Sequence, residues 1–359
     1  MFDHKHYVPI LRWKYSEKHA LKFTKPEDKE RITPLIELVP PPKPPKTKVK
    51  KANPPKQKTI ADVMQNAPKE IADFWGVDNI FVDLHLLGLE AAIGGMEKIF
   101  DDTRVLGLKI IPVLRINSTK EIQSISRSII KKDNRGYCLR LFQSDLDLPN
   151  FYEALTSFVA LMKITEKSVD IIVDLGISHV DHDFNAVLEM FADSLPKWRT
   201  FTITSGAFPV DLSEGFELGV NYRPRIDWKN WLDQVRSKKV KRCPTFSDYT
   251  IQHPIYRELD FVGSVSRSVR YTSTEQWLVM RGQSDKAEGS ARSAQYPAHA
   301  QLLANMTEYC GENLCHGDKY IWDKGRDLKT DKTGGAREWL LAGINHHLKF
   351  VVDQIASLS

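Results

Sequence analysis

Eight short runs rich in Val and Ile recur along the chain, and a longer segment with amphipathic helical spacing follows most of them. Parallel strands joined by crossover helices give this alternation. The runs cover residues 7–13, 32–38, 79–84, 109–116, 136–142, 170–176, 200–206 and 244–251. Eight such units fit a TIM-type (β/α)8 barrel better than a doubly wound sheet, which usually has fewer strands. The sequence therefore predicts the α/β class and a closed parallel barrel.

The alternation stops after the eighth run. Two strand-like segments, 264–272 and 275–282, predict a β-hairpin, and a helical run and a polar loop follow it. The final helix carries Leu340, Ile344 and Leu348 on one stripe, which suits a helix that closes the barrel. Because insertions after barrel strands project over the catalytic face, we expect three parts. The first part, residues 1–251, holds barrel strands one to eight and a flexible Lys/Pro loop at 40–58. The second part, residues 252–335, is an insertion after strand eight whose hairpin covers the barrel mouth. The third part, residues 336–359, is a closing amphipathic helix.

The net charge of +5 over 359 residues is concentrated in one segment. Residues 40–58 hold seven lysines, seven prolines and no acidic residue, so the rest of the chain sums to 5 − 7 = −2. One interpretation is an extended, solvated linker. The other is a polycation that collects nucleic acid or a nucleotide, with an affinity that falls steeply as salt rises. In this second interpretation the nucleic-acid-binding residues are Lys43, Lys46, Lys48, Lys50 and Lys51.

Several classes of protein are disfavoured by what the sequence lacks. It has no uninterrupted apolar run of about 18 residues, so we expect a cytoplasmic protein without a membrane partner. No GxGxxG or GxxxxGKS/T motif is present, which disfavours a Rossmann or P-loop nucleotide site. The four cysteines form no CxxC pair, so redox chemistry and structural zinc are not expected.

Polar residues stand late in almost every predicted strand, where the strands of a barrel point toward the site. They are Lys14, Glu37, Asp83, Arg115, Arg140, Asp174, Ser205 and Asp248, with His85 just after the third strand. Charged side chains within apolar strands are costly to bury unless they are paired. One interpretation is an internal network in which three carboxylates neutralise three cations. The other is a functional mouth lined by carboxylates and guanidinium groups together.

The functional interpretation gives these residues roles. Carboxylates bind hard divalent ions such as Mg²⁺ or Mn²⁺, and arginines offer forked donors to phosphate. We expect Glu37, Asp83 and Asp174 to hold the metal, and these three with Asp248 to act as the catalytic acids and bases. The expected substrate-binding cations are Lys14, Arg115, Arg140, Arg270 and Arg281. This combination suits phosphoester chemistry.

Two histidine-containing segments carry weaker expectations. His346 and His347 are adjacent on the final helix, so their side chains point about 100° apart and cannot easily share one metal ion. We expect one of them to pack and the other to contact a loop. The run 179–183 follows the sixth strand and has the residue types of a metal site, yet Asp183 also suits a helix N-cap.

Several segments of the chain carry a resemblance to a known family. They are YVPILRWKYSEKHAL, ITPLIELVP, SVRYT with WLVMRG, GDKYIWDKG and GINHHLKFVVDQI. Together they resemble the phage and prophage "beta protein" family of bacterial proteins. The resemblance spans nearly the whole chain. It implies an anti-phage-defence or mobile-element context, and it brings no established reaction with it. The Lys/Pro loop after Glu37 departs from the family pattern.

Two functions remain open. One is a hydrolase, of the phosphodiesterase or nuclease type, that acts at the barrel mouth on a phosphate-containing substrate. The other is a non-catalytic sensor or scaffold that binds a phage component or a partner protein of a defence assembly. A catalytic site should show metal-dependent activity, whereas a scaffold should have its mouth charges paired internally.

Overall fold

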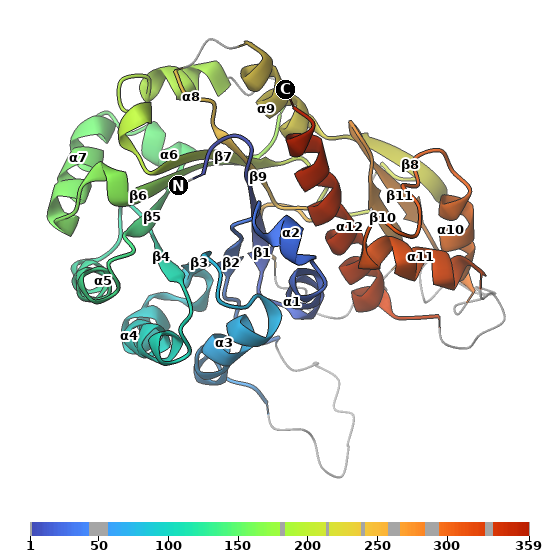
Figure 1. Cartoon of the computed structure of the whole chain (residues 1–359), viewed down its shortest axis with the longest axis horizontal. Helices are drawn as coiled ribbons and strands as arrows, with labels where there is room; N and C mark the ends of the chain where they lie inside the picture. Colours follow the sequence, from blue (N-terminus) through green and yellow to red (C-terminus); the bar gives the residue numbers. More distant parts are fainter. Residues whose placement is uncertain are drawn as a thin grey trace.

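The computed structural model describes residues 2–42, 57–179, 184–212, 215–237, 241–257, 266–283, 294–326 and 333–358. Within these ranges, eight parallel strands close into a barrel in the order β1-β2-β3-β4-β5-β6-β7-β9 (Figure 1). The strands are β1 (Tyr7–Arg12), β2 (Leu35–Glu37), β3 (Ile80–Asp83), β4 (Ile110–Leu114), β5 (Tyr137–Phe142), β6 (Val169–Ile177), β7 (Thr200–Gly206) and β9 (Thr245–Asp248). Each of the eight sequence runs coincides with one barrel strand. The predicted α/β barrel of the TIM type is therefore confirmed.

Helices surround the barrel and connect its strands (Figure 1). They are α1 (Tyr15–Lys22), α2 (Pro26–Lys29), α3 (Ile60–Phe74), α4 (Leu89–Val105), α5 (Lys120–Asp133), α6 (Gln143–Leu146), α7 (Phe151–Met162), α8 (Phe184–Met190), α9 (Ile226–Ser237) and α12 (Ala336–Ala356), with short 3-10 turns at η1 (His85–Leu87), η2 (Glu166–Ser168) and η3 (Leu195–Lys197). Local sequence sets where some of them begin. At α3, the Thr59 hydroxyl accepts from the Asp62 backbone N–H at 3.1 Å, and the Asp62 carboxylate accepts from the Thr59 N–H at 2.7 Å. This capping box starts α3 directly after the Lys/Pro segment.

Side chains alternate between the barrel interior and its helical coat. On β1, Tyr7 and Leu11 belong to the large apolar cluster formed with the helices, whereas Val8 and Ile10 belong to a smaller separate cluster. That smaller cluster fills the interior with residues such as Leu35, Phe81, Ile111, Cys138 and Ile172. The next inward position on β1 is Arg12. The same step leads from an apolar residue to Glu37 on β2, Asp83 on β3, Arg115 after β4, Arg140 on β5 and Asp174 on β6. The interior is thus apolar toward the amino ends of these strands and charged at their carboxyl ends.

A second, smaller sheet lies beside the barrel, beyond α12 (Figure 1). It is antiparallel, in the order β10-β11-β8, and consists of β8 (Gly219–Pro224), β10 (Val269–Thr272) and β11 (Gln276–Arg281). Helices α10 (Gln295–Ala304) and α11 (His316–Arg326) share an apolar core with it. The sequence predicts the β10–β11 hairpin but not β8, which comes from the connection between β7 and β9. We call β8, β10, β11, α10 and α11 the satellite unit.

Helix α12 packs between the barrel and the satellite unit. Ile344 and Leu348 of the predicted stripe are fully buried, Leu340 is half-buried, and all residues from Leu341 to Leu348 are buried as well. The helix is therefore covered on more than one side, because it contacts α1 on the barrel side and β10 and α11 of the satellite unit. Gly343 permits this close packing, since a Cβ atom there would lie 2.6 Å from the backbone oxygen of Arg270.

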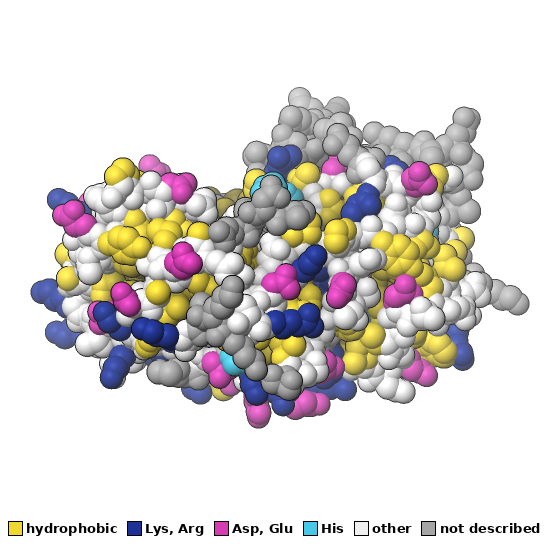
Figure 2. Space-filling view, turned by 90° about the horizontal axis from the view of Figure 1, so that it is seen from above, with side chains coloured by type: hydrophobic (Ala, Val, Ile, Leu, Met, Phe, Trp, Pro, Cys, Tyr) yellow, Lys and Arg dark blue, Asp and Glu magenta, His cyan; other side chains and the backbone are white. Residues whose placement is uncertain are grey.

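Basic and acidic side chains are interspersed over the surface that Figure 2 shows, and neither sign forms one continuous field. This fits the nearly balanced charge of the chain outside residues 40–58. None of the described helices has both the length and the apolar character needed to cross a membrane.

Candidate functional site

Arg140, near the carboxyl end of β5, lies at the centre of a charged group inside the barrel mouth. Its Nη1 donates to Glu37 Oε1 and to Asp83 Oδ2, each at 2.9 Å. Its Nε and Nη2 donate to Asp174 Oδ2 at 2.9 and 2.7 Å. Nη2 also donates to the Tyr249 hydroxyl at 2.8 Å, and this hydroxyl donates to Asp174 Oδ2 at 2.5 Å. One guanidinium therefore joins side chains from β2, β3, β6 and the end of β9.

Two further arginines complete this group, which we call the mouth network. Arg115 Nη2 donates to Asp83 Oδ2 at 3.0 Å. Arg12 forms an ion pair with Glu37 at 3.7 Å, and its Nη2 donates to the backbone oxygens of His253 and Pro254 at 2.8 Å each. Three guanidinium groups thus face three carboxylates, so the formal charges of the mouth network cancel.

The mouth network is almost completely shielded from solvent. Arg140 and Asp83 are each 2% exposed, Asp174 is 1% exposed and Glu37 is 5% exposed. Burial by itself would raise the pKa of the Asp83 carboxyl, but Arg115, Arg140 and the backbone N–H of His85 outweigh it and hold that pKa below its ordinary value. Burial raises the pKa of Tyr249 well above its ordinary value, so its hydroxyl keeps its proton. The Asp83 carboxyl is therefore ionised, and all three carboxylates of the network are paired with arginines.

The accessible rim of the mouth carries a cation. Arg115 retains 16% exposure of its side chain, and its guanidinium lies 4.2 Å from the centre of the Phe142 ring. Its buried Nε has no hydrogen-bond acceptor among the described residues. His85 lies beside it, with part of its side chain exposed to solvent. Partial loss of solvent around the imidazole, together with the positive charge of Arg115, lowers the pKa of His85. At neutral pH the rim therefore presents a guanidinium next to a neutral imidazole.

Alternation along the strands brings together Glu37, Asp83, Arg115, Arg140 and Asp174, as the sequence predicts. Their catalytic, metal-binding and substrate-binding roles stay predictions. The internal pairing of their charges matches the alternative in which carboxylates and cations form one network.

Other predicted site residues lie elsewhere. The exposed Lys14 follows β1, with its Nζ 4.7 Å from the Tyr256 ring centre. Asp248 turns away from the barrel interior: its Oδ1 accepts from the Tyr7 hydroxyl at 2.5 Å, and its Oδ2 contacts His347 of α12. Asp248 faces outward because it stands one position out of phase with the inward residues of β9.

The two arginines of the predicted hairpin also contact backbone groups outside the mouth network. Arg270 Nη1 donates to the backbone oxygen of Ile251 at 2.9 Å, and Arg281 Nη1 donates to that of Phe216 at 2.7 Å. These contacts anchor β10 and β11 of the satellite unit. Among the described insertion residues, 252–254 accept hydrogen bonds from Arg12, and the Tyr256 ring centre lies 5.6 Å from the Arg12 guanidinium.

Three residues of this region were not among the predicted site residues. Arg12 and Tyr249 belong to the mouth network, and Glu17 on α1 accepts from Gln252, the residue that also contacts Arg12. Burial raises the pKa of Glu17. The alternation Val8, Ile10 contains a usable signal for Arg12, because the next inward position lies two residues further along β1.

Some predicted residues lie outside the described ranges. These are Lys43, Lys46, Lys48, Lys50 and Lys51 of the Lys/Pro segment, and Asp181, His182 and Asp183 of the run after β6. The described chain leaves the barrel after Glu37, at the carboxyl end of β2, and returns at 57–59 just before α3.

A second buried polar cluster connects the barrel to the satellite unit through the two adjacent histidines. His347 Nε2 lies 2.9 Å from Asp248 Oδ2, and its Nδ1 lies 2.8 Å from Thr272 Oγ1 on β10. His346 Nε2 lies 2.8 Å from the Thr272 backbone oxygen, and its Nδ1 lies 3.0 Å from Asp318 Oδ2. Both imidazoles are fully buried, so this cluster is part of the packing between units.

Comparison with known proteins identifies the family of this chain. A model of the family described as Beta protein matches residues 7–353, which is nearly the whole chain. No curated protein matches the sequence. The match includes both the barrel and the satellite unit, and the chain therefore belongs to the Beta protein family.

Proposed function

We propose that this protein binds a phosphate-containing ligand at the barrel mouth, with Arg115 as the residue that contacts the phosphate. The observation that supports this most is the position of Arg115. It is the partly exposed guanidinium of a group whose formal charges cancel when Arg115 itself is counted. Each carboxylate of the mouth network is paired with an arginine, so an anion that approaches Arg115 meets a cation and no unpaired carboxylate of this network.

The chemistry of the rim suits a phosphate oxygen. A guanidinium offers several N–H donors in one plane, and Arg115 uses Nη2 for Asp83 while its side chain stays partly exposed. The Phe142 ring and the Asp83 carboxylate hold this guanidinium in place. The neighbouring His85 imidazole, neutral at pH 7, can exchange a proton with a bound substrate.

A divalent metal ion fits less well among the mouth carboxylates. Glu37, Asp83 and Asp174 all accept hydrogen bonds from Arg140, so Mg²⁺ or Mn²⁺ between them would have to displace this guanidinium. We therefore derive no step through a metal at these residues. If the protein is an enzyme, we propose that it is a metal-dependent phosphodiesterase or nuclease. Cleavage measured without metal and with Mg²⁺ or Mn²⁺ tests this activity.

A non-catalytic sensor or scaffold is the second candidate. The pairing of every carboxylate in the mouth network favours it, because a catalytic acid or base needs a proton position that is free to change. In this form the protein acts in the cytoplasm, in phage defence or in a mobile element, and reports the ligand to nucleic acid or to a partner protein.

The test is a panel of nucleotides and of single- and double-stranded nucleic acids, with binding and cleavage measured without metal and with Mg²⁺ or Mn²⁺. The variants are Arg115→Ala and, as a control, Lys109→Ala, which removes an exposed cation just before β4 at the opposite end of the barrel. Turnover that needs both metal and Arg115 supports the hydrolase, and binding without turnover supports the sensor. Absence of binding, or equal binding by Arg115→Ala, contradicts the proposal.

A further inference from the structure

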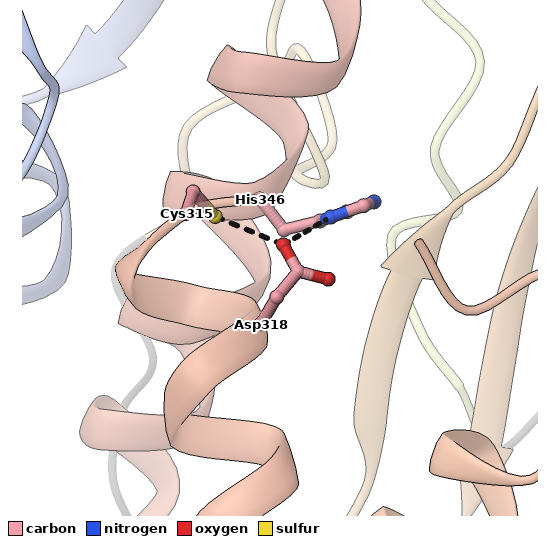
Figure 3. Close-up of side chains that lie close together, drawn as sticks. All are labelled: Cys315, Asp318 and His346. Atoms are coloured by element: carbon pink, nitrogen blue, oxygen red, sulfur yellow. Dashed lines mark hydrogen bonds and ion pairs between the residues drawn. The ribbon is translucent and has the colours of Figure 1, made fainter. Parts of the chain in front are cut away.

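We infer that Cys315, Asp318 and His346 form a binding site for a divalent metal ion of the zinc type, located in the satellite unit and α12 (Figure 3). Cys315 Sγ and His346 Nδ1 each lie 3.0 Å from Asp318 Oδ2. The three ligand atoms lie within 4.8 Å of one another, and all three residues are buried. Thiolate, carboxylate and imidazole are the ligands that zinc takes in proteins, and Cys315 and Asp318 have the short spacing typical of a ligand pair.

The hydrogen-bond partners of His346 place either a proton or a metal ion between its Nδ1 and Asp318. His346 Nε2 lies 2.8 Å from the backbone oxygen of Thr272, which can only accept, so Nε2 carries a proton. A neutral imidazole then has a lone pair on Nδ1, and this lone pair faces Asp318 Oδ2, which is also an acceptor. A proton or a metal ion must lie between these two atoms. Because Cys315 Sγ approaches the same oxygen, a metal ion satisfies all three groups together.

The surroundings of the ligands resemble those of a metal site. In such sites the second nitrogen of a ligating histidine usually donates to a carbonyl or carboxylate, and ligating carboxylates are themselves hydrogen-bonded. Here His346 donates to the Thr272 carbonyl, and the free oxygen of Asp318 accepts from the Tyr271 hydroxyl at 2.7 Å. The Tyr271 ring also stacks on the His346 imidazole, with ring centres 3.7 Å apart. These contacts fix the orientation of two ligands before any ion binds.

Close packing of α11 on α12 brings the ligands together. A Cβ atom at Gly317 would lie 2.1 Å from the backbone oxygen of Ala342, so glycine is needed where the first turn of α11 meets α12. The Gly317 N–H donates to Asn345 Oδ1 at 2.9 Å and ties the same turn to α12. The expectation against structural zinc rests on the absence of CxxC pairs. This cluster instead combines a Cys-x-x-Asp pair with a histidine of the neighbouring helix.

The charges of the site balance when the ion is bound. A divalent ion with one thiolate, one carboxylate and one neutral imidazole sums to 2 − 1 − 1 = 0, which suits a buried position. Zinc binds the thiolate form of cysteine, so binding of the ion would release the proton of the Cys315 thiol. The bound ion would hold the first turn of α11 to α12. Three protein ligands leave the fourth position to water.

The experiment measures the metal content of the full chain, expressed without a histidine tag and purified without chelator. We expect about one zinc ion per chain. After chelation, Co²⁺ should give the absorption of a thiolate-to-cobalt charge transfer, and the thermal midpoint should fall on chelation and recover with Zn²⁺. A parent protein that carries no stoichiometric metal and takes up neither Zn²⁺ nor Co²⁺ would overturn the proposal. In that case the cation between His346 and Asp318 is a proton only.

Matched variants identify the ligands. Cys315→Ser should lose the bound metal and the cobalt charge-transfer absorption, because a serine hydroxyl is a poor zinc ligand. Cys310→Ser is the control, since Cys310 is exposed and lies five positions earlier on the same connection, and it should keep both. Metal bound equally by the parent and by Cys315→Ser would show that the ion is held elsewhere. If Cys315→Ser does not fold, the cobalt spectrum of the parent still decides, because only a thiolate ligand gives that absorption.

Discussion

Arg140 on β5 donates through both Nε and Nη2 to a single oxygen, Oδ2, of Asp174 on the adjacent strand β6, at 2.9 and 2.7 Å. The two side chains are 2% and 1% exposed. A buried pair of this kind contributes little net stability by its presence, but removal of one partner leaves the other charge buried and uncompensated.

The first prediction therefore concerns Arg140→Ala. It leaves three carboxylates of the mouth network without their shared guanidinium, so we expect the free energy of unfolding to fall by about 3–5 kcal/mol. Urea titration measures this change. Lys109→Ala, at the opposite end of the barrel, should change it by less than about 0.5 kcal/mol. A loss for Arg140→Ala as small as that of the control would contradict the mouth network as described.

The second prediction concerns α12. Ile344 is fully buried between the barrel and the satellite unit, so Ile344→Asp should destabilise the chain by several kcal/mol, on the order of 4 or more. Ala336→Asp is the control, because Ala336 is exposed in the first turn of the same helix, where a negative charge is favourable. Thermal melting of both variants checks this. A soluble Ile344→Asp protein with the parental melting temperature would disprove the position of α12.

The third prediction concerns pH. Burial, with the charge of Asp248 adding to it, raises the pKa of Asp227 to about 7. A carboxyl whose pKa is higher in the folded state binds more protons there, so its contribution to the free energy of unfolding falls as pH rises from about 4 to about 7. Asp227→Asn should remove this contribution and flatten the pH profile in that interval. Urea titrations of both proteins across it give the difference, and parallel profiles would show that Asp227 ionises normally.

The strands of the barrel were predictable from sequence because their apolar runs are local and long enough to stand out. Strand β8 was not, since its residues are alternately exposed and half-buried and its pairing partner, β11, is distant in the chain. Nothing in the local pattern of residues 219–224 shows that pairing. The sequence therefore indicates the barrel fully and the satellite unit only in part.

Similar reasoning separates the site residues that were predictable from those that were not. Asp83 and Arg140 are charged residues within apolar strands, which a chain seldom places there without a partner. Tyr249 was overlooked because an aromatic residue in an apolar run suggests packing, while its neighbour Asp248 drew attention by its charge. Which of these two side chains faces the barrel interior depends on the phase of the inward and outward alternation along β9. The pairing of Cys315 with His346 depends on how α11 packs on α12, which sequence spacing does not reveal.

The fourth prediction concerns the Lys/Pro segment. Its seven lysines and lack of acidic residues should make it the main source of attraction for polyanions. We expect weak nucleic-acid binding without sequence preference, with log affinity falling against log salt at a slope of about −0.7 to −0.9 per phosphate contact. Deletion of residues 43–58 should remove most of this binding and leave the melting temperature nearly unchanged. A deletion variant that binds as tightly as the parent at low salt would limit the segment to the role of a linker.

The most direct test of the central claim is the affinity of the full chain for inorganic pyrophosphate, measured by calorimetry at one fixed ionic strength. The parent and Lys109→Ala should bind equally, because Lys109 lies away from the mouth. Arg115→Ala should bind about tenfold more weakly or worse, since it loses charge-assisted hydrogen bonds to the phosphate. If the parent does not bind pyrophosphate, or if Arg115→Ala binds it as tightly as the parent, the barrel mouth is not the phosphate site that we propose.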